Sequence, residues 1–162
     1  FDGPMEWGPR ALGARSILAD PRRADTRERL NAAVKLRESF RPFAPAVLAE
    51  QIPDWFGPAH ADAFDSPFMS KVVPVRAERR ALVPAITHED GTARLQSLAR
   101  DHATLLRPII EHFLALTEVP MVVNTSFNEN EPLVATPVEA VDCFLRTGMD
   151  ALIMPPFLVE RA

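Results

Sequence analysis

Residues 119–128 have the sequence VPMVVNTSFN, in which a short apolar run leads into small polar side chains. The apolar part, Val119 to Asn124, is predicted to form a buried strand because it is short and rich in β-branched residues. Four hydrogen-bonding side chains lie at the end of that strand: Asn124, Thr125, Ser126 and Asn128. Their amides and hydroxyls can contact a phosphate or a planar polar group without adding charge. The alternative is a turn in which they bond their own backbone.

Helices and strands are expected on both sides of this segment, within limits set by sixteen prolines. Helices are predicted over residues 25–34, 102–117 and 136–146. The first begins with Asp25 as N-cap, and the last has a capping box formed by Thr136 and Glu139. Strands are predicted over residues 68–75, 81–87, 151–154 and 157–159. Residues 41–67, rich in proline and aromatic side chains, are predicted to form an irregular packed loop. This mixture indicates an α/β (α+β) fold.

The composition is that of an ordinary globular domain, with 47% apolar residues, 25% charged residues and a net charge of −4. This charge disfavours a broad electrostatic grip on nucleic acid but is compatible with a local cationic pocket. Cys143 is the single cysteine and is predicted to be a small buried side chain, so a reducing cytoplasm is the expected location. No apolar run is long enough for a membrane span. Because the chain starts at Phe1 with a dense motif, we expect a domain of a longer polypeptide.

Residues 34–43, with the sequence VKLRESFRPF, carry three cations: Lys35, Arg37 and Arg41. They precede the stiff segment Pro42 to Pro45, which limits their mobility. Fixed cations suit phosphate binding, because they neutralise charge that develops on the oxygens of a triphosphate. The alternative is a solvated helix end at which basic residues interact favourably with the helix dipole.

The N-terminal segment, residues 6–16, combines a Gly-Pro turn with Glu6, Arg10 and Arg15. Arginine offers a planar fork of donors that matches phosphate or carboxylate, so these residues are predicted to clamp an anion or to form an interdomain contact. A solvated surface turn is the alternative.

Residues 88–96 place Arg94 and Gln96 on one face of a predicted strand, since strand side chains repeat every two residues. Arg94 is therefore a further candidate for anion binding. No metal site is predicted, because consecutive side chains such as His88, Glu89 and Asp90 rarely converge on one ion.

Four segments together, residues 5–18, 34–45, 88–96 and 124–128, resemble in order and spacing the C-terminal domain of the NodU/CmcH O-carbamoyltransferases. That domain is YrdC-like, so the resemblance implies a twisted mixed sheet flanked by helices, in a single domain over residues 1–162. The Lys-x-Arg and Thr-Ser-x-Asn elements are similar to the nucleotide-site signatures of that fold. The chain departs from the family pattern at Pro4, where arginine is common, and at Asn130, where glycine is common.

The resemblance also implies an activity. In this family the YrdC-like domain makes carbamoyl adenylate from ATP and carbamoyl phosphate, normally with Mg²⁺. A metal-binding N-terminal domain of the ASKHA type then transfers the carbamoyl group to a hydroxyl of a small molecule, such as a nodulation factor or an antibiotic-type natural product. This chain would supply the activation half. Its expected partners are ATP, carbamoyl phosphate and the N-terminal domain of the same polypeptide, with neither nucleic acid nor membrane.

The resemblance assigns roles to individual residues. Catalytic roles fall on Lys35, Arg37 and Arg94. Contacts with the nucleotide or with carbamoyl phosphate fall on Arg41, Asn124, Thr125, Ser126 and Asn128. Two other functions stay open from the sequence, a YrdC-like domain that binds RNA and a non-catalytic scaffold domain.

Overall fold

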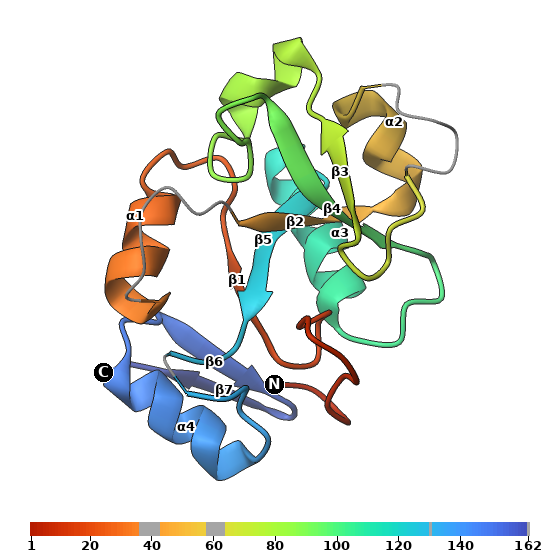
Figure 1. The fold of residues 1–162 in the computed structure, drawn as a ribbon. Coiled ribbons are helices and arrows are strands. Elements are labelled where there is room, and N and C mark those ends of the chain that lie inside the picture. The colour runs from red at the N-terminus through yellow and green to blue at the C-terminus, as the bar shows by residue number, and fades with distance from the viewer. Residues whose placement is uncertain (36–42, 58–63, 130, 162) are drawn as a thin grey trace.

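The computed structural model describes residues 1–35, 43–57, 64–129 and 131–161. Its centre is a five-stranded sheet with the strand order β1-β5-β2-β4-β3 (Figure 1). The strands are β1 (Ser16–Ala19), β2 (Ala44–Leu48), β3 (Lys71–Pro74), β4 (Thr92–Leu98) and β5 (Met121–Ser126). Strands β2 and β4 are parallel and the other pairs are antiparallel. The expected mixed sheet in an α/β domain is therefore confirmed.

The central strand β2 sets the register of its two neighbours. Its residue Ala44 pairs with Asn124 of β5, and Ala46 pairs with Gln96 of β4. All five residues of β2 are buried. The polar residues Gln96 and Asn124 therefore lie on either side of β2, next to alanines whose side chains are single methyl groups.

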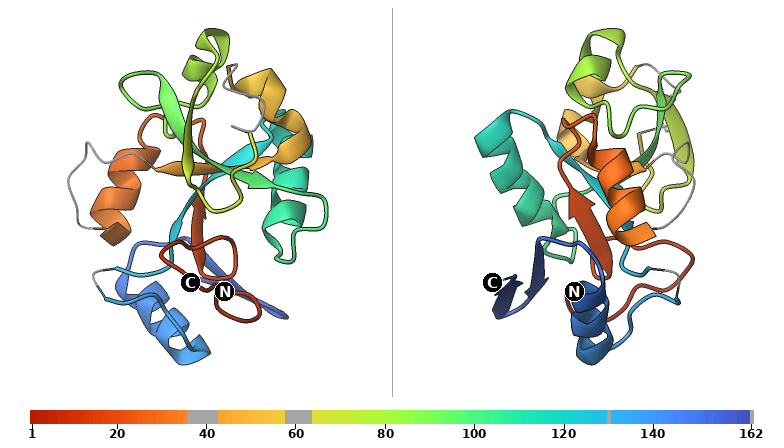
Figure 2. Two further views of the ribbon diagram at one scale, coloured as in Figure 1. Left: turned by 45° about the vertical axis from the view of Figure 1, so that its right-hand side comes forward. Right: turned by 90° about the vertical axis from the view of Figure 1, so that its left-hand side faces the viewer.

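Two apolar clusters occupy the two faces of the sheet. Helix α3 (Leu106–Thr117) packs against β2 and β5, where Leu106 and Ile110 meet Ala46 and Val122. The larger cluster lies on the other face and includes residues of α1 (Thr26–Leu30) and α4 (Pro137–Arg146). In the right-hand view of Figure 2, α3 and α1 lie on opposite sides of β1. Each face is thus covered by helices, as strands buried on both faces require.

Shorter elements complete the fold. The residues Asn31–Lys35 form a π-helical turn after α1, and the helix α2 (Ile52–Trp55) follows a 3₁₀ turn at Ala49–Gln51. A second 3₁₀ segment spans Ala77–Leu82. The strands β6 (Ala151–Met154) and β7 (Phe157–Glu160) form a hairpin beside α4 (Figure 1). Within the described ranges, no helix combines the length and apolar character needed to cross a bilayer.

Several predicted elements are confirmed. The helix that follows Thr136 has the expected capping box, with Pro137 at its first position. The final pair of strands forms as predicted. In α3, Pro108 lies in the first turn, where its missing N–H costs no helical hydrogen bond. Cys143 is fully buried, and burial raises the pKa of its thiol to about 11.

Other predictions were wrong, and proline explains two of them. Residues 81–87 are not a strand, because the 3₁₀ segment is followed by a turn around Pro84. Residues 44–48 are not part of an irregular loop but the central strand, in which Pro45 lies opposite Val123. Because proline is rare in central strands, the sequence pattern does not predict a strand at Pro45.

The remaining differences are at helix and strand ends. Asp25 does not cap α1 through its side chain, because its carboxylate forms an ion pair with Arg23 at 2.7 Å. The predicted strand over residues 68–75 is limited to β3, and the first strand, β1, was not predicted at all.

The capping box of α4 gives a first test of the fold. Thr136 accepts a hydrogen bond from the Glu139 N–H at 3.3 Å, so Thr136→Ala leaves that donor unpaired. We expect the free energy of unfolding to fall by about 1 kcal/mol in urea titrations. Val138→Ala is the matched control, because Val138 is 78% exposed in the same turn. Equal effects of the two substitutions would show that the capping box does not stabilise the helix.

Candidate functional site

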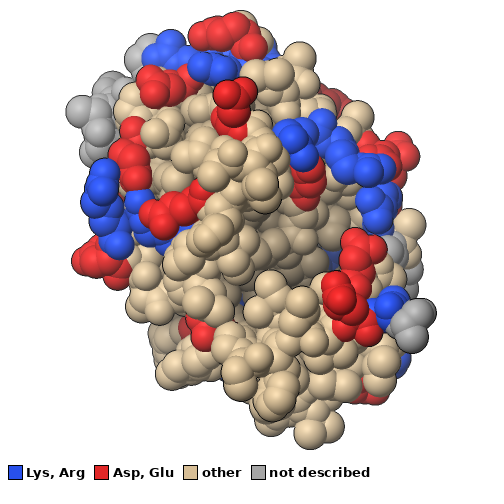
Figure 3. Space-filling model, turned by 180° about the vertical axis from the view of Figure 1, so that it is seen from behind, with Lys and Arg blue, Asp and Glu red and all other residues tan. Residues whose placement is uncertain are grey.

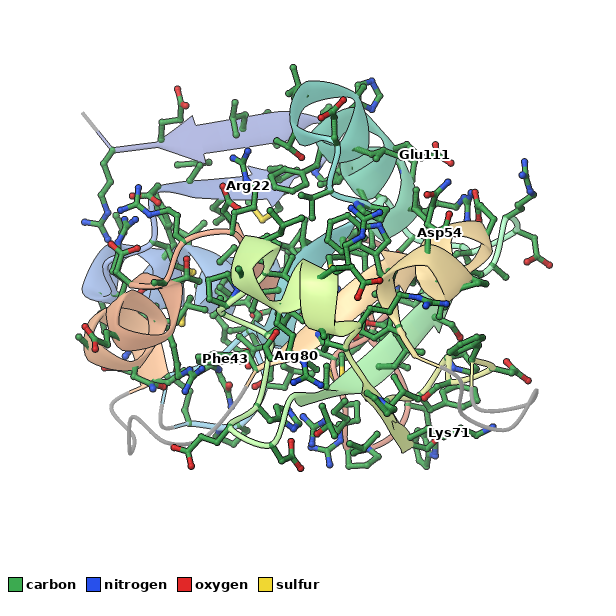
Figure 4. The ribbon with its side chains drawn as sticks, turned by 90° about the horizontal axis from the view of Figure 1, so that it is seen from above. Arg22, Phe43, Asp54, Lys71, Arg80 and Glu111 are labelled. Carbon is green, nitrogen blue, oxygen red and sulfur yellow. The ribbon has the colours of Figure 1, made fainter. Side chains whose placement is uncertain are left out.

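A cavity of about 380 Å³ lies at the end of the central strands. Its lining includes five of the predicted site residues: Arg10, Arg94, Asn124, Thr125 and Ser126. None of the described residues that line it is acidic. Phe43, which directly precedes β2, also contributes, and in the view from above it lies on the side of the molecule away from Glu111 of α3 (Figure 4). Among the described residues, the cavity therefore gathers cationic and neutral polar groups, as suits an anion site.

Strand geometry brings Arg94 to this cavity. Arg94 and Gln96 are two residues apart on β4 and share a face with Ala46 of β2. Asn124 of β5 shares that face through its pairing with Ala44. Arg94 and Asn124 both line the cavity, and the Asn124 amide donates to the Gln96 side chain. These contacts are consistent with the prediction that Arg94 and Gln96 lie on one face of the strand.

Lys35 is buried beside the cavity, with a side chain that is only 5% exposed. Its ammonium donates to the carbonyl and hydroxyl oxygens of Ser126 at 2.6 and 3.1 Å. It also donates to the carbonyl and amide oxygens of Asn128 at 2.8 and 2.7 Å. The structure therefore joins Lys35, Ser126 and Asn128, and Ser126 links this group to the cavity. A buried ammonium needs such partners, because an unsatisfied charge in the interior is costly.

A network of ion pairs holds the loop that follows β5. The Asn128 amide donates to the Glu131 carbonyl at 2.8 Å. Arg146 of α4 then contacts the carboxylates of Glu129 and Glu131 at 2.5 and 3.0 Å, and that of Asp142 at 2.9 Å. The Arg146 guanidinium lowers the pKa of the Glu131 carboxyl. Sequence reasoning missed this network, although the spacing of Asp142 and Arg146 on one helix was a visible signal.

His88 is a second residue that the site prediction left out. It lines the cavity, and its Nδ1 lies 3.0 Å from the Thr92 hydroxyl. Its Nε2 is buried and has no hydrogen-bond partner in the described parts of the chain. Burial lowers the pKa of the imidazole, Asp90 opposes this shift, and Arg94 adds to it. This environment therefore favours the neutral ring, which adds no charge to the cavity.

Glu6 and Arg15 lie elsewhere and shape the N-terminal loop. One Glu6 oxygen accepts the N–H groups of Leu12 and Ala14 at 2.8 and 2.5 Å. Arg15 is buried, donates to the carbonyls of Asp2 and Gly3, and stacks on the Phe1 ring at 3.5 Å. These contacts fix the loop that carries Arg10 to the cavity.

Three residues singled out from the sequence, Arg37, Arg41 and Asn130, lie outside the described residues. A second cavity, of about 460 Å³ and mostly apolar, lies between β1, α1 and β6. It contains none of the predicted site residues.

The oxygens around Lys35 predict a stability effect. Lys35→Met removes the donor and leaves partly buried oxygens of Ser126 and Asn128 without it. We expect the free energy of unfolding to fall by about 2–3 kcal/mol in urea titrations. Lys71→Met, at the other lysine of the chain, is the control and should cost less than about 1 kcal/mol because Lys71 is only partly buried. A similar loss in both variants would contradict a structural role for the Lys35 ammonium.

The Arg146 network predicts a pH dependence. Because the pKa of Glu131 is lowered in the folded protein, its pairing stabilises the fold above the ordinary value of 4.5 and is lost as pH falls through the lowered value. Arg146→Gln should therefore reduce the unfolding free energy at pH 7, and reduce it by less at acidic pH. Unfolding measured between pH 7 and pH 3, with the exposed Arg100→Gln as control, checks this. A difference that is constant with pH would rule out the ion pair as its source.

Comparison with known proteins agrees with the resemblance. Residues 1–161 match the family model described as carbamoyltransferase C-terminus. The chain is 48% identical over 161 residues to nodulation protein NolNO of Sinorhizobium fredii, covering 98% of this chain and 23% of the relative. It is 47% identical over 160 residues to nodulation protein NolO of Bradyrhizobium diazoefficiens, covering 98% of this chain and 29% of the relative. Nodulation protein U of Azorhizobium caulinodans is 44% identical over 126 residues, which cover 78% of this chain and 22% of that protein. The chain thus spans less than a third of these relatives, and it belongs to the carbamoyltransferase C-terminal domain family.

Proposed function

We propose that this chain is the activating domain of an O-carbamoyltransferase, which forms carbamoyl adenylate from ATP and carbamoyl phosphate. Counting atoms, the reaction consumes one water and gives carbamoyl adenylate, pyrophosphate and inorganic phosphate. Transfer of the carbamoyl group to a small-molecule hydroxyl would be the work of an N-terminal domain in the same polypeptide. The acceptor would be a small molecule with a free hydroxyl, such as a nodulation factor or an antibiotic-type natural product.

The observation that carries this proposal is the cavity where Arg10 and Arg94 meet the polar end of β5, with no acidic side chain among the described lining residues. Two polyanionic substrates repel one another, so their approach requires fixed cations. Arginine can hold phosphate oxygens through two parallel hydrogen bonds. The hydroxyls and amide of Asn124, Thr125 and Ser126 supply further polar contacts without adding charge.

The residues that line the cavity also bear on how Mg²⁺ would reach the site. Mg²⁺ prefers carboxylate, water and phosphate oxygens, and the described lining residues offer no carboxylate. We therefore propose that the ion enters bound to the ATP phosphates, where it neutralises their charge. The chain's own part is to bind the anions and to hold their orientation.

Each residue has a proposed role in this scheme. Arg94 and Arg10 would bind phosphate oxygens. Lys35 would supply positive potential beside the cavity while it fixes Ser126 and Asn128. Arg37 and Arg41 are proposed as further phosphate contacts on the resemblance alone.

RNA binding is the main alternative. It requires a continuous basic face, and Figure 3 shows that on the back of the molecule basic and acidic side chains alternate around an uncharged area. The net charge of −4 also opposes it. RNA binding with a steep salt dependence, in the absence of nucleotide binding, would favour that alternative.

The test is to incubate the protein with ATP, Mg²⁺ and carbamoyl phosphate and to detect carbamoyl adenylate and pyrophosphate by mass spectrometry. Arg94→Gln should slow product formation by about a hundredfold or more. Arg100→Gln, whose side chain is 82% exposed, should leave it unchanged.

Three outcomes decide the proposal. Product that is lost only in Arg94→Gln supports it. Nucleotide binding without product would place the reaction in the combined protein rather than in this domain alone. If the protein binds neither ATP nor carbamoyl phosphate, the proposed function is wrong.

A further inference from the structure

Two buried amides meet across the central strand. Gln96 and Asn124 are 0% and 2% exposed, and the Asn124 amide donates to the Gln96 Oε1 at 2.6 Å. Strand β2 lies between their strands, with Ala44 and Ala46 at the paired positions. The methyl groups of these alanines leave room for the two amides to touch, which larger side chains would fill.

Two backbone carbonyls fix the orientation of both amides. The Gln96 Nε2 donates to the Leu12 carbonyl at 3.0 Å, which turns Gln96 Oε1 toward Asn124. The Asn124 Nδ2 donates to that oxygen and to the Ala11 carbonyl at 3.2 Å. If either amide were flipped, oxygen would face oxygen. The assignment of nitrogen and oxygen is therefore determined by the network.

This arrangement leaves one acceptor unused. The Asn124 Oδ1 is buried and has no hydrogen-bond partner among the described residues, although Asn124 lines the anion cavity. A buried acceptor without a partner is costly, and such atoms are rare in folded proteins. The arginine N–H groups that line the cavity can donate to phosphate oxygens of a ligand, whereas this oxygen is an acceptor and needs an N–H or O–H donor.

We propose that Asn124 Oδ1 accepts a hydrogen bond from the NH₂ group of a carbamoyl compound, and that Gln96 holds Asn124 in the orientation that makes this possible. This inference rests on the proposed function and deepens it. Arg94 and Arg10 bind the phosphate part of the ligand, and Asn124 selects ligands in which a primary amide accompanies the phosphate. Asn124 is thus the specificity residue, and Gln96 is its positioning residue.

The proposal can be tested with two stable ligands that differ in one group. Phosphonoacetamide carries the NH₂ group, and 2-oxopropylphosphonate has a methyl group in its place. The wild-type protein should bind phosphonoacetamide roughly tenfold to a hundredfold more tightly in calorimetric titrations, because the methyl group leaves Oδ1 unpaired.

Asn124→Leu should reduce this ratio to near one by weakening phosphonoacetamide binding. Gln96→Leu should reduce it partly, because the Asn124 amide is then free to turn. Asn31→Leu is the matched control, since Asn31 is another buried amide and lies outside the cavity lining. This variant should keep the wild-type ratio.

The outcomes separate the two proposals. If the wild-type protein binds both ligands equally and also binds inorganic phosphate, the role of Asn124 is wrong and the anion site stands. That result needs no variant, so a folding defect in Asn124→Leu cannot obscure it. If the wild-type protein binds neither ligand nor inorganic phosphate, the proposed function fails together with the inference.

Discussion

The buried ammonium of Lys35 is the interaction on which the candidate site depends. It joins a π-helical turn to the end of β5, 91 residues further along the chain, through oxygens of Ser126 and Asn128. Because the ammonium bonds to both backbone and side-chain oxygens, it fixes the backbone path after β5 as well as the side-chain rotamers of Ser126 and Asn128. The energetic reason is the cost of burying a charge, since an ammonium that loses these partners would have to leave the interior or lose its proton. A neutral side chain could fill the same space but could not hold these oxygens together.

The small side chains of β2 impose a second constraint. Because β2 pairs in parallel with β4 and antiparallel with β5, residues of both neighbours point to one face beside Ala44 and Ala46. At one end of that face, Ala46 and Val122 pack against α3 and make an apolar cluster. At the other end, Arg94 and Asn124 line the cavity. The same alternation of side chains along the strands therefore builds both core and site.

How much of this could be predicted from the sequence depends on whether local chemistry or distant contacts decide each element. The capping box at Thr136 and the polar end of β5 follow from local sequence, and both were predicted. The strand β2 was missed because Pro45 opposes a strand locally, while pairing with β4 and β5 stabilises it. Likewise, the residue types in the 6–16 loop indicated an anion clamp or an interdomain contact, without separating the roles of its three charged residues. Only the structure separates Arg10, which lines the cavity, from Glu6 and Arg15, which hold the loop.

Affinity and selectivity have different physical sources in such a cavity. Arginine donors bind any phosphate, so in the proposed site Arg10 and Arg94 would distinguish poorly between ligands that carry the same anionic group. The neutral His88 does not change this, because burial and Arg94 both disfavour its cationic form. Discrimination requires a group whose interaction differs between ligands, and specificity is a difference of affinities. In the proposed role, Asn124 Oδ1 would be such a group, because its orientation is fixed by Gln96 and a backbone carbonyl rather than by the ligand. An acceptor held in place before binding loses no freedom when the ligand arrives, so the whole hydrogen bond contributes to the difference between ligands.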